Sequence, residues 1–218
     1  MANLLKQTIT TTDLNYLKSI FDSLATPIIT STTVSGDYLY LTLDNTLTIN
    51  FHKSSTTAFN PITVTYDGTT TAEIARAYVT GNGLRITLVY ADNIFYMQLQ
   101  DGAGRRGLFF YQKLGSQKFY GYKGSKNTQG VAFYDISGLE IHSVATENIY
   151  TYGNAITQAA DIGHILYLNI SILFIGASKA FINSEFISCS TITADQILTF
   201  ENKNYYSLGT HIVVPIDN

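Results

Sequence analysis

Short runs in which apolar and polar residues alternate are the feature that most constrains this chain. In residues 37–51 (DYLYLTLDNTLTINF), leucine, isoleucine and phenylalanine alternate with tyrosine, threonine and asparagine on both sides of Asp44-Asn45. A strand places successive side chains on opposite faces, so this period of two indicates half-buried strands. The Asp-Asn dipeptide indicates the turn between them. Residues 37–51 are therefore predicted to form a β-hairpin.

Similar runs recur up to the C-terminus, so the sequence predicts an all-β protein, a sandwich or distorted barrel of antiparallel strands. The predicted strands are 28–33, 37–43, 46–52, 61–66, 84–90, 94–100, 108–113, 118–123, 131–136, 139–145, 148–152, 164–175, 186–193, 197–200 and 204–214. Two segments are less regular. Residues 71–78 fit either a short helix or a strand, and residues 154–162 fit a short helical turn.

One N-terminal helix is predicted, over residues 13–25 (DLNYLKSIFDSLA). Its leucines and its phenylalanine recur every three or four residues, which gives the helix one apolar face. Thr12 or Asp13 can cap the N-terminus, and Pro27 is expected to end the helix.

The domain organisation is predicted from the segments that flank this helix. The Thr-rich residues 1–12 are expected to form an N-terminal arm that another chain holds in an assembly. Residues 13–218 are expected to form a single β-rich domain. A boundary inside it near 153–163 is a second option, because the chain beyond that point is more apolar and richer in isoleucine.

Few charges are available to cover the surface of this protein. Of its 218 residues, 13% are charged and 45% are hydrophobic, and the net charge is −3. The charged share is about half of that in an average soluble domain. So few charges give little protection against association, which favours a protein whose surface is partly covered by partners. The alternative is a monomer with a surface rich in hydroxyl groups. The small net charge provides no field that would recruit nucleic acid or a membrane.

The single cysteine and the apolar runs indicate the type of cellular compartment in which the protein is made. Cys189 is the only cysteine, so no internal disulfide can form, which is typical of a protein made in a reducing compartment or one that needs no disulfides. The N-terminus lacks a basic segment followed by an apolar stretch, so no signal peptide is expected. Residues 165–175 (ILYLNISILFI) are about half a membrane span in length and are expected to form a buried strand or pair of strands.

Residues 102–107 (GAGRRG) match the pattern G-x-G-x-x-G of dinucleotide-binding proteins. That pattern binds phosphate only where a helix N-terminus follows the glycines. The residues that follow here, LFFYQK, are typical of a strand. The motif is therefore predicted to be a glycine-rich hairpin loop, and no cofactor is expected.

A basic stretch begins in the same loop and is interleaved with aromatic residues. Six cations fall within 22 residues that contain no acidic residue: Arg105, Arg106, Lys113, Lys118, Lys123 and Lys126. Three interpretations stay open. The cations can be solvated side chains on hairpins whose aromatic residues face the core, or contacts to a neighbouring subunit or a polyanionic ligand. Together with the aromatic residues, they can also bind nucleic acid through phosphate contacts and base stacking.

No motif typical of a catalytic or metal site is found in the sequence. The four histidines, at positions 52, 142, 164 and 211, form no set with metal-ligand spacing. Glu140-x-His142 is the closest approach to one, and a surface salt bridge is the simpler interpretation of that pair. Cys189 has no neighbouring histidine that would activate a thiol. The dispersed acidic residues locate no carboxylate pair of the kind that glycoside hydrolases use. The sequence therefore predicts no metal and no enzymatic activity.

The chain end has its own turn chemistry. Gly209 is expected at a turn or bulge, where a side chain would be unfavourable. Residues 212–214 are expected to form a final strand that completes a sheet. Pro215 is expected to end this strand, because proline has no N–H to donate to a neighbouring strand.

Residues 180–217 (AFINSEFISCSTITADQILTFENKNYYSLGTHIVVPID) combine a short polar strand, a Thr-rich strand, a Tyr-Tyr strand followed by Leu-Gly-Thr, and a terminal Ile-Val-Val-Pro-Ile-Asp. This ending resembles those of structural proteins in the neck, tail or baseplate of tailed bacteriophages and phage-tail-like particles. The resemblance implies assembly into a ring or larger particle, without catalysis, from copies of this chain and other virion proteins. It also implies a virion location after assembly in the host bacterial cytoplasm.

The predicted function is therefore that of a non-enzymatic structural subunit of a bacteriophage virion or phage-tail-like particle that self-associates. Open strand edges and termini would pair with neighbouring sheets through main-chain hydrogen bonds. A carbohydrate-binding or adhesion module, with exposed tyrosines that stack on sugar rings, is the alternative. A glycan hydrolase fits less well. Neither nucleic acid nor a membrane is an expected partner.

Overall fold

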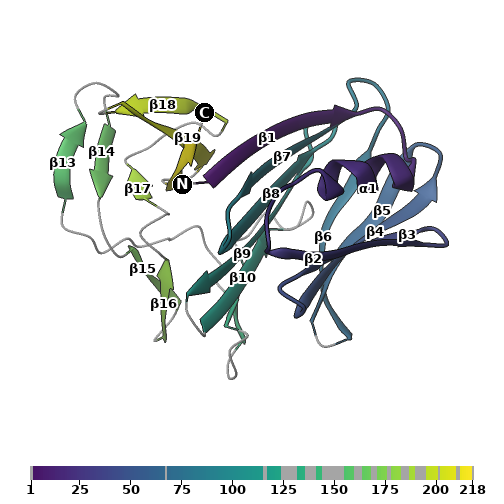
Figure 1. The fold of residues 1–218 in the computed structure, drawn as a ribbon, viewed down its shortest axis with the longest axis horizontal. Coiled ribbons are helices and arrows are strands. Elements are labelled where there is room, and N and C mark those ends of the chain that lie inside the picture. Colours follow the sequence, from purple (N-terminus) through teal and green to yellow (C-terminus); the bar gives the residue numbers. More distant parts are fainter. Residues whose placement is uncertain are drawn as a thin grey trace. The chain divides into compact units, whose positions relative to one another are not determined.

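The structure, a computed structural model, consists almost entirely of strands, with one nine-residue helix among the residues that it describes (Figure 1). This confirms the predicted fold class, an all-β sandwich or distorted barrel of mostly antiparallel strands with one N-terminal helix. The described residues are 2–66, 68–114, 117–123, 132–135, 141–143, 155–159, 164–167, 171–175, 178–182, 187–189, 195–200, 202–209 and 212–217.

The chain divides into two units. The N-terminal unit comprises Leu5–Gln112 and Tyr120–Thr128. The C-terminal unit comprises Met1–Leu4, Lys113–Phe119 and Gln129–Asn218. The division thus falls near residues 112 and 128, away from the segment 153–163 where the composition changes.

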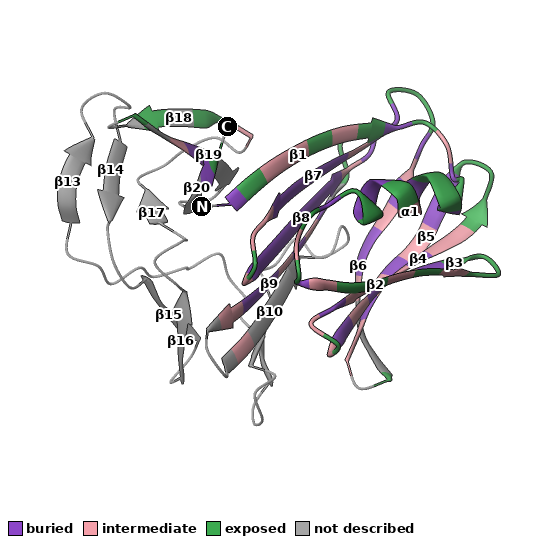
Figure 2. Ribbon diagram, in the orientation of Figure 1, coloured by how far each residue is buried: buried purple, intermediate pink, exposed green. Residues whose placement is uncertain are grey.

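A five-stranded antiparallel meander forms one sheet of the N-terminal unit. Its strands follow the chain order: β2 (Ile29–Ser35), β3 (Tyr38–Leu43), β4 (Leu47–Ser55), β5 (Ala58–Tyr66) and β6 (Thr69–Tyr78). In β3, β4 and β5, the side chains on one face are apolar and fully buried, and Figure 2 colours buried positions purple. The core side chains on this face are Leu39, Leu41, Leu43, Leu47, Ile49, Phe51, Ile62 and Val64. The strand alternation in the sequence therefore sorts core side chains from outer ones.

The turn between β3 and β4 has the geometry that its sequence predicts. Asp44 and Asn45 both have positive φ, +48° and +53°, and the Thr46 N–H donates to the Leu43 carbonyl at 3.0 Å. Positive φ at both central residues defines a type I′ turn, whose twist matches that of the flanking strands.

The second sheet of the N-terminal unit contains β1, β7, β8 and β9. The bounds of these strands are β1 (Ala2–Ile9), β7 (Leu84–Tyr90), β8 (Ile94–Gln100) and β9 (Arg106–Leu114), and β10 (Gln117–Lys123) follows β9. Their order is β9-β8-β7-β1. Leu88 pairs with Met97, and Met97 pairs with Phe109 on its other side, so that fully buried side chains line up across three strands.

Strand β1 corrects the expectation of an N-terminal arm over residues 1–12. Ala2 and Asn3 pair in parallel with Ile216 and Asp217 of the same chain, and the strand also neighbours β7. The sequence of β1 has only a weak alternation. A strand with neighbours on both sides is held by main-chain hydrogen bonds, which the side-chain pattern does not reveal.

Helix α1 (Leu14–Asp22) has the predicted N-cap and ends earlier than predicted. The Asp13 carboxylate accepts hydrogen bonds from the N–H groups of Asn15 (2.9 Å) and Tyr16 (3.4 Å). At the other end, Ser23 is the C-cap, and its backbone N–H donates to the Ser19 carbonyl at 3.1 Å. The helix therefore ends at Asp22, three residues before the predicted end at residue 25.

The apolar face of α1 covers the core beside β2 and β3. Leu17 and Phe21 are fully buried, and the rings of Phe21 and Phe51 lie 5.7 Å apart between centroids. The helix thus supplies core side chains that the five-stranded sheet alone lacks.

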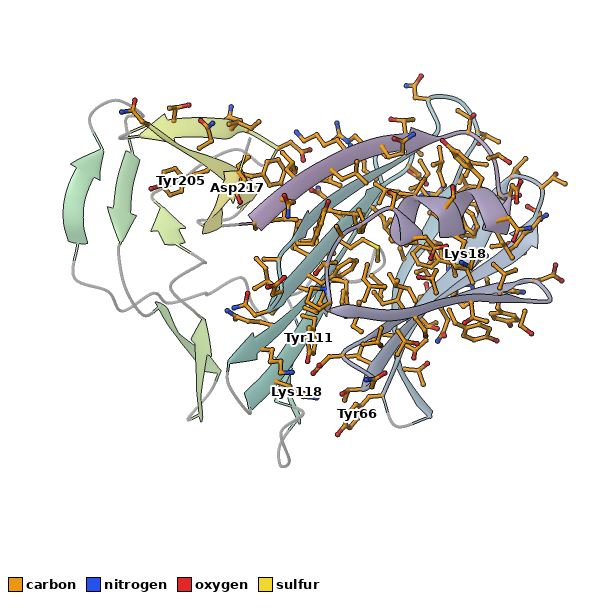
Figure 3. All side chains as sticks on the ribbon, in the orientation of Figure 1. Lys18, Tyr66, Tyr111, Lys118, Tyr205 and Asp217 are labelled. Atoms are coloured by element: carbon orange, nitrogen blue, oxygen red, sulfur yellow. The ribbon has the colours of Figure 1, made fainter. Side chains whose placement is uncertain are left out.

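A partly buried hydrogen bond links the two sheets of the N-terminal unit. The hydroxyl of Tyr111 on β9 (labelled in Figure 3) donates to Oδ2 of Asp44 in the β3–β4 turn at 2.8 Å. Tyr111 is fully buried. Burial, followed by the bond to Asp44, raises the pKa of this phenol far above its ordinary value of 10.0.

Replacing Tyr111 by phenylalanine is expected to lower the free energy of unfolding by about 1.5 kcal/mol, the value of a hydrogen bond to a charged group. The folded state holds the phenol proton more tightly than the unfolded chain does, so this stabilisation is complete below pH 10 and decreases as the pH rises above it. Urea denaturation of both proteins between pH 7 and about pH 11 measures the difference. A constant difference across that range would contradict the assigned bond.

The C-terminal unit contains shorter strands. They are β11 (Ala132–Asp135), β12 (Ile141–Ser143), β13 (Ala155–Ala159), β14 (His164–Tyr167), β15 (Ser171–Ile175), β16 (Ser178–Ile182), β17 (Ile187–Cys189), β18 (Ile197–Phe200), β19 (Lys203–Gly209) and β20 (Ile212–Asp217). Strand β20 pairs with three others: β17 and β19 in antiparallel orientation, and β1 in parallel orientation. Strands β15 and β16 form a separate hairpin.

These strands correct one local prediction and decide two that were open. Residues 155–159, predicted within a helical turn, form β13, because pairing with a neighbouring strand overrides a weak local preference. Residues 71–78, which fitted either a helix or a strand, belong to β6. The run 164–175 contains a pair of strands, β14 and β15, which is one of the two options that its sequence allowed.

The bulge at Gly209 is confirmed, whereas the prediction that Pro215 ends the last strand is wrong. The register of β19 against β20 shifts between Ser207 and Gly209, and β20 continues through Pro215 to Asp217. On one side of β20, Pro215 lies between Val213, which pairs with β17, and Ile216, which pairs with β1. A missing N–H is tolerated on that side because, among the described residues, neither β17 nor β1 pairs with Pro215, which is paired only with Tyr205 of β19.

Candidate functional site

The six predicted contact cations are distributed over one loop and two strands. Arg105 lies in the β8–β9 loop, Arg106 and Lys113 in β9, Lys118 and Lys123 in β10, and Lys126 lies outside the described residues. Lys113 and Lys118 belong to the C-terminal unit, whereas Arg105 belongs to the N-terminal one. The structure thus does not gather the six into one described cluster, and their role in subunit or polyanion contacts stays a prediction.

Arg105 has partners within its own hairpin loop. Its backbone N–H and that of Ala103 donate to Oδ1 of Asp101 at 2.9 and 3.0 Å. Its guanidinium Nε lies 3.4 Å from Oδ2 of Asp101, whose side chain is fully buried, and the guanidinium carbon lies 4.6 Å from the Tyr78 ring centroid. The loop therefore uses Arg105 to neutralise a buried carboxylate. The segment 102–107 is a hairpin loop between two strands, as predicted.

The outer face of the five-stranded sheet forms a second candidate site, an open groove over β3, β4 and β5. The groove has a volume of about 680 Å³ and is lined by tyrosine, threonine, asparagine and histidine side chains together with Pro61 and Gly68. None of the lining residues that the structure describes is Asp, Glu, Lys or Arg. Its chemistry is therefore that of hydroxyl, carboxamide and aromatic groups.

Three aromatic side chains lie next to one another in this groove, with Tyr38 adjacent to both of the others. Tyr38 on β3 pairs with His52 on β4, and their rings lie nearly parallel, at 15°, with centroids 4.5 Å apart. The centroid of the Tyr40 ring, two residues along β3, lies 5.8 Å from that of Tyr38, and the two ring planes are tilted by 22°. Nδ1 of His52 lies 2.8 Å from the carbonyl oxygen of Asn60, which can only accept, so Nδ1 carries the proton and the ring orientation is fixed.

Hydrogen bonds between neighbouring strands hold the polar part of the groove. The Asn50 amide donates to the hydroxyls of Thr63 (3.2 Å) and Thr65 (2.6 Å) on β5. The hydroxyls of Thr42 and Thr48 lie 3.3 Å apart across β3 and β4. Both described hydrogen bonds of the Asn50 side chain use its amide nitrogen. Its Oδ1 can therefore accept a hydrogen bond on the groove face of the sheet.

The two edges of the five-stranded sheet differ in charge. Strand β2 (ITSTTVS) carries no charged residue, and its side chains at Thr30, Ser31, Thr33 and Ser35 are exposed. At the opposite edge, Arg76 of β6 forms a two-point ion pair with Glu73, with N–O distances of 2.7 and 3.0 Å. Charges on an edge strand disfavour pairing with another chain, so β2 is the less protected edge.

Strand β9 also approaches β6 closely. A Cβ at Gly107 would lie 2.7 Å from the Ala75 Cβ and 2.8 Å from the Ile74 carbonyl oxygen, so only glycine permits this contact. The β6 side of the sheet is therefore packed within the unit.

The sequence predicted only part of these surfaces. The alternation in residues 37–51 indicates that Tyr38 and Tyr40 share a face opposite the leucines. The placement of His52 beside Tyr38, and of Asn50 beside two β5 threonines, depends on strand register, which the local pattern does not supply. The open edge β2 likewise follows from strand order.

The residues that the structure describes contain neither a metal-binding group nor a helix that could span a membrane. No group of three or more His, Cys, Asp or Glu side chains that could hold a metal ion occurs there. Within the same residues, no helix has the length and apolarity needed to cross a membrane. The Glu140 and His142 pair and the side chain of Cys189 fall outside the described side chains.

No protein-family model, curated protein or solved structure matches this chain significantly.

Proposed function

We propose that this protein is a non-enzymatic structural subunit of a bacteriophage virion or phage-tail-like particle, and that it assembles with copies of itself. The observation that carries the proposal is the uncharged, exposed edge strand β2. In an antiparallel pair, every second residue directs its N–H and C=O away from the partner strand. Strand β2 therefore presents a row of main-chain groups that a strand of a second copy can bind.

The composition of the chain supports the same function, and so does the resemblance of residues 180–217 to the endings of phage structural proteins. With 13% charged residues, the chain has few side chains that would keep copies apart. The Glu73–Arg76 ion pair and the approach of β9 protect the other edge of the five-stranded sheet, so the association uses β2. A ring or a filament forms when β2 of one copy binds a different surface of the next copy.

Replacing Thr33 by lysine is expected to weaken self-association by at least about tenfold, because it places a charge on the open edge. The side chain is exposed, so folding should be retained. Light scattering at a series of protein concentrations measures the change in mass. Electron microscopy of the native protein is expected to show rings or tubes.

Asn15→Lys on the exposed side of α1 is the matched control, since it adds the same charge to the helix and not to the edge strand β2. The mass of the assembly that Asn15→Lys forms in solution should equal that of the native protein. A native protein that is monomeric at its highest soluble concentration would overturn the proposed function. Equal loss of mass in both variants would assign the effect to net charge rather than to the edge.

A further inference from the structure

The groove over β3, β4 and β5 has a chemistry that restricts its ligand. Phosphates, nucleic acids and acidic peptides are bound through cationic side chains, and no Lys or Arg occurs among the described residues that line this groove. A purely apolar ligand would leave Oδ1 of Asn50 and the further hydrogen-bonding capacity of the threonine hydroxyls unused, which is unfavourable in a buried contact. The ligand must therefore present neutral polar groups and apolar surface together.

A saccharide ring meets both requirements. Its C–H faces are apolar and pack on aromatic rings, whose faces carry partial negative charge. Its hydroxyls both donate and accept hydrogen bonds, as the threonine hydroxyls and the Asn50 carboxamide do. The adjacent rings of Tyr38, Tyr40 and His52 supply the aromatic surface, and Asn50 with its threonine partners supplies the polar one.

The groove is also largely organised before any ligand binds. The His52–Asn60 bond fixes one of these three rings, and the Asn50 amide fixes two threonine hydroxyls. Side chains that are already ordered lose little conformational entropy on binding. The volume of about 680 Å³ lies within the range of about 300–1,000 Å³ that is usual for sites of small ligands.

We propose that this groove binds a neutral saccharide, with the sugar ring stacked on the adjacent rings of Tyr38, Tyr40 and His52 and its hydroxyls bonded to the Asn50 and threonine side chains. Saccharide binding would be an adhesive function in addition to self-association. The saccharide proposal does not depend on the proposed self-association. The groove lies on the face of the sheet, whereas self-association uses the main-chain groups at its edge.

Calorimetry with neutral hexasaccharides of glucose, galactose, mannose and N-acetylglucosamine, and with hexagalacturonate as the anionic comparison, tests the proposal. At least one neutral hexasaccharide is expected to bind saturably, and hexagalacturonate more weakly. Tyr38→Ala is expected to lower the affinity about tenfold or more, because it removes the ring that is adjacent to both of the others. Thr48→Val, which removes a groove hydroxyl and keeps the shape, is expected to lower it several-fold.

Tyr16→Ala is the matched control. Tyr16 on α1 is 40% exposed and Tyr38 is 38% exposed, so both variants remove a tyrosine of equal accessibility, and only one lies in the groove. Affinity should be unchanged in Tyr16→Ala. Absence of saturable binding to every neutral hexasaccharide, equal affinity in Tyr38→Ala, or equally tight binding of hexagalacturonate would each overturn the proposal.

Discussion

Removal of residues 209–218 is expected to unfold the C-terminal unit and make the protein insoluble. This truncation deletes β20, the strand that pairs with β1, β17 and β19. Strands β1, β17 and β19 would each lose β20 as a neighbour and would expose unpaired main-chain groups. Since the net stability of a domain is only about 5–15 kcal/mol, loss of this strand should exceed what the unit can tolerate. Soluble yield and amide hydrogen exchange in β17 and β19 measure the effect.

Deletion of Asn218 alone is the control for this truncation, because it leaves every residue of β20 in place. It should keep the native yield and exchange pattern. A truncated chain that is soluble, of native mass and equally resistant to heat would show that residues 209–218 are dispensable. The C-terminal resemblance to phage structural proteins would then lose the segment on which it rests.

Replacing Gly83 by alanine is expected to lower the free energy of unfolding by about 3–5 kcal/mol, through backbone strain and overpacking together. Gly83 has a φ of +79°, a backbone conformation that residues other than glycine rarely adopt. A Cβ there would also lie 2.7 Å from the Ile9 carbonyl oxygen and 2.9 Å from the Thr8 Cγ2, both on β1. Urea denaturation of the native and variant proteins provides the measurement.

Gly81→Ala separates the two causes. Gly81 has a similar φ, +67°, but a Cβ there would meet nothing within 4 Å. Its variant should therefore lose only about 1 kcal/mol, the strain component. If both variants lost the same free energy, the close contact between Gly83 and β1 would be contradicted, and with it the seating of β1 beside β7.

The sequence by itself determined the features that depend on neighbours close along the chain. Alternation in residues 37–51 defined two strands and the side chains on each face. Asp44-Asn45 identified the turn, Asp13 capped the helix, and Gly209 marked a bulge. Each of these follows from steric and hydrogen-bonding preferences within a few residues, so a short window of sequence contains the necessary information.

Only the tertiary structure decided which strands are neighbours. Residues 2–9, expected to form an arm, became β1 because β7 and β20 lie beside them. Register brought His52 to Tyr38, and strand order left β2 at an open edge. Pairing between distant segments depends on main-chain hydrogen bonds that any sequence can make and on the entropy of closing the loops between them. No local sequence pattern encodes strand pairing or loop-closure entropy. The open edge β2 and the groove over β3, β4 and β5 could therefore be identified only from the tertiary structure.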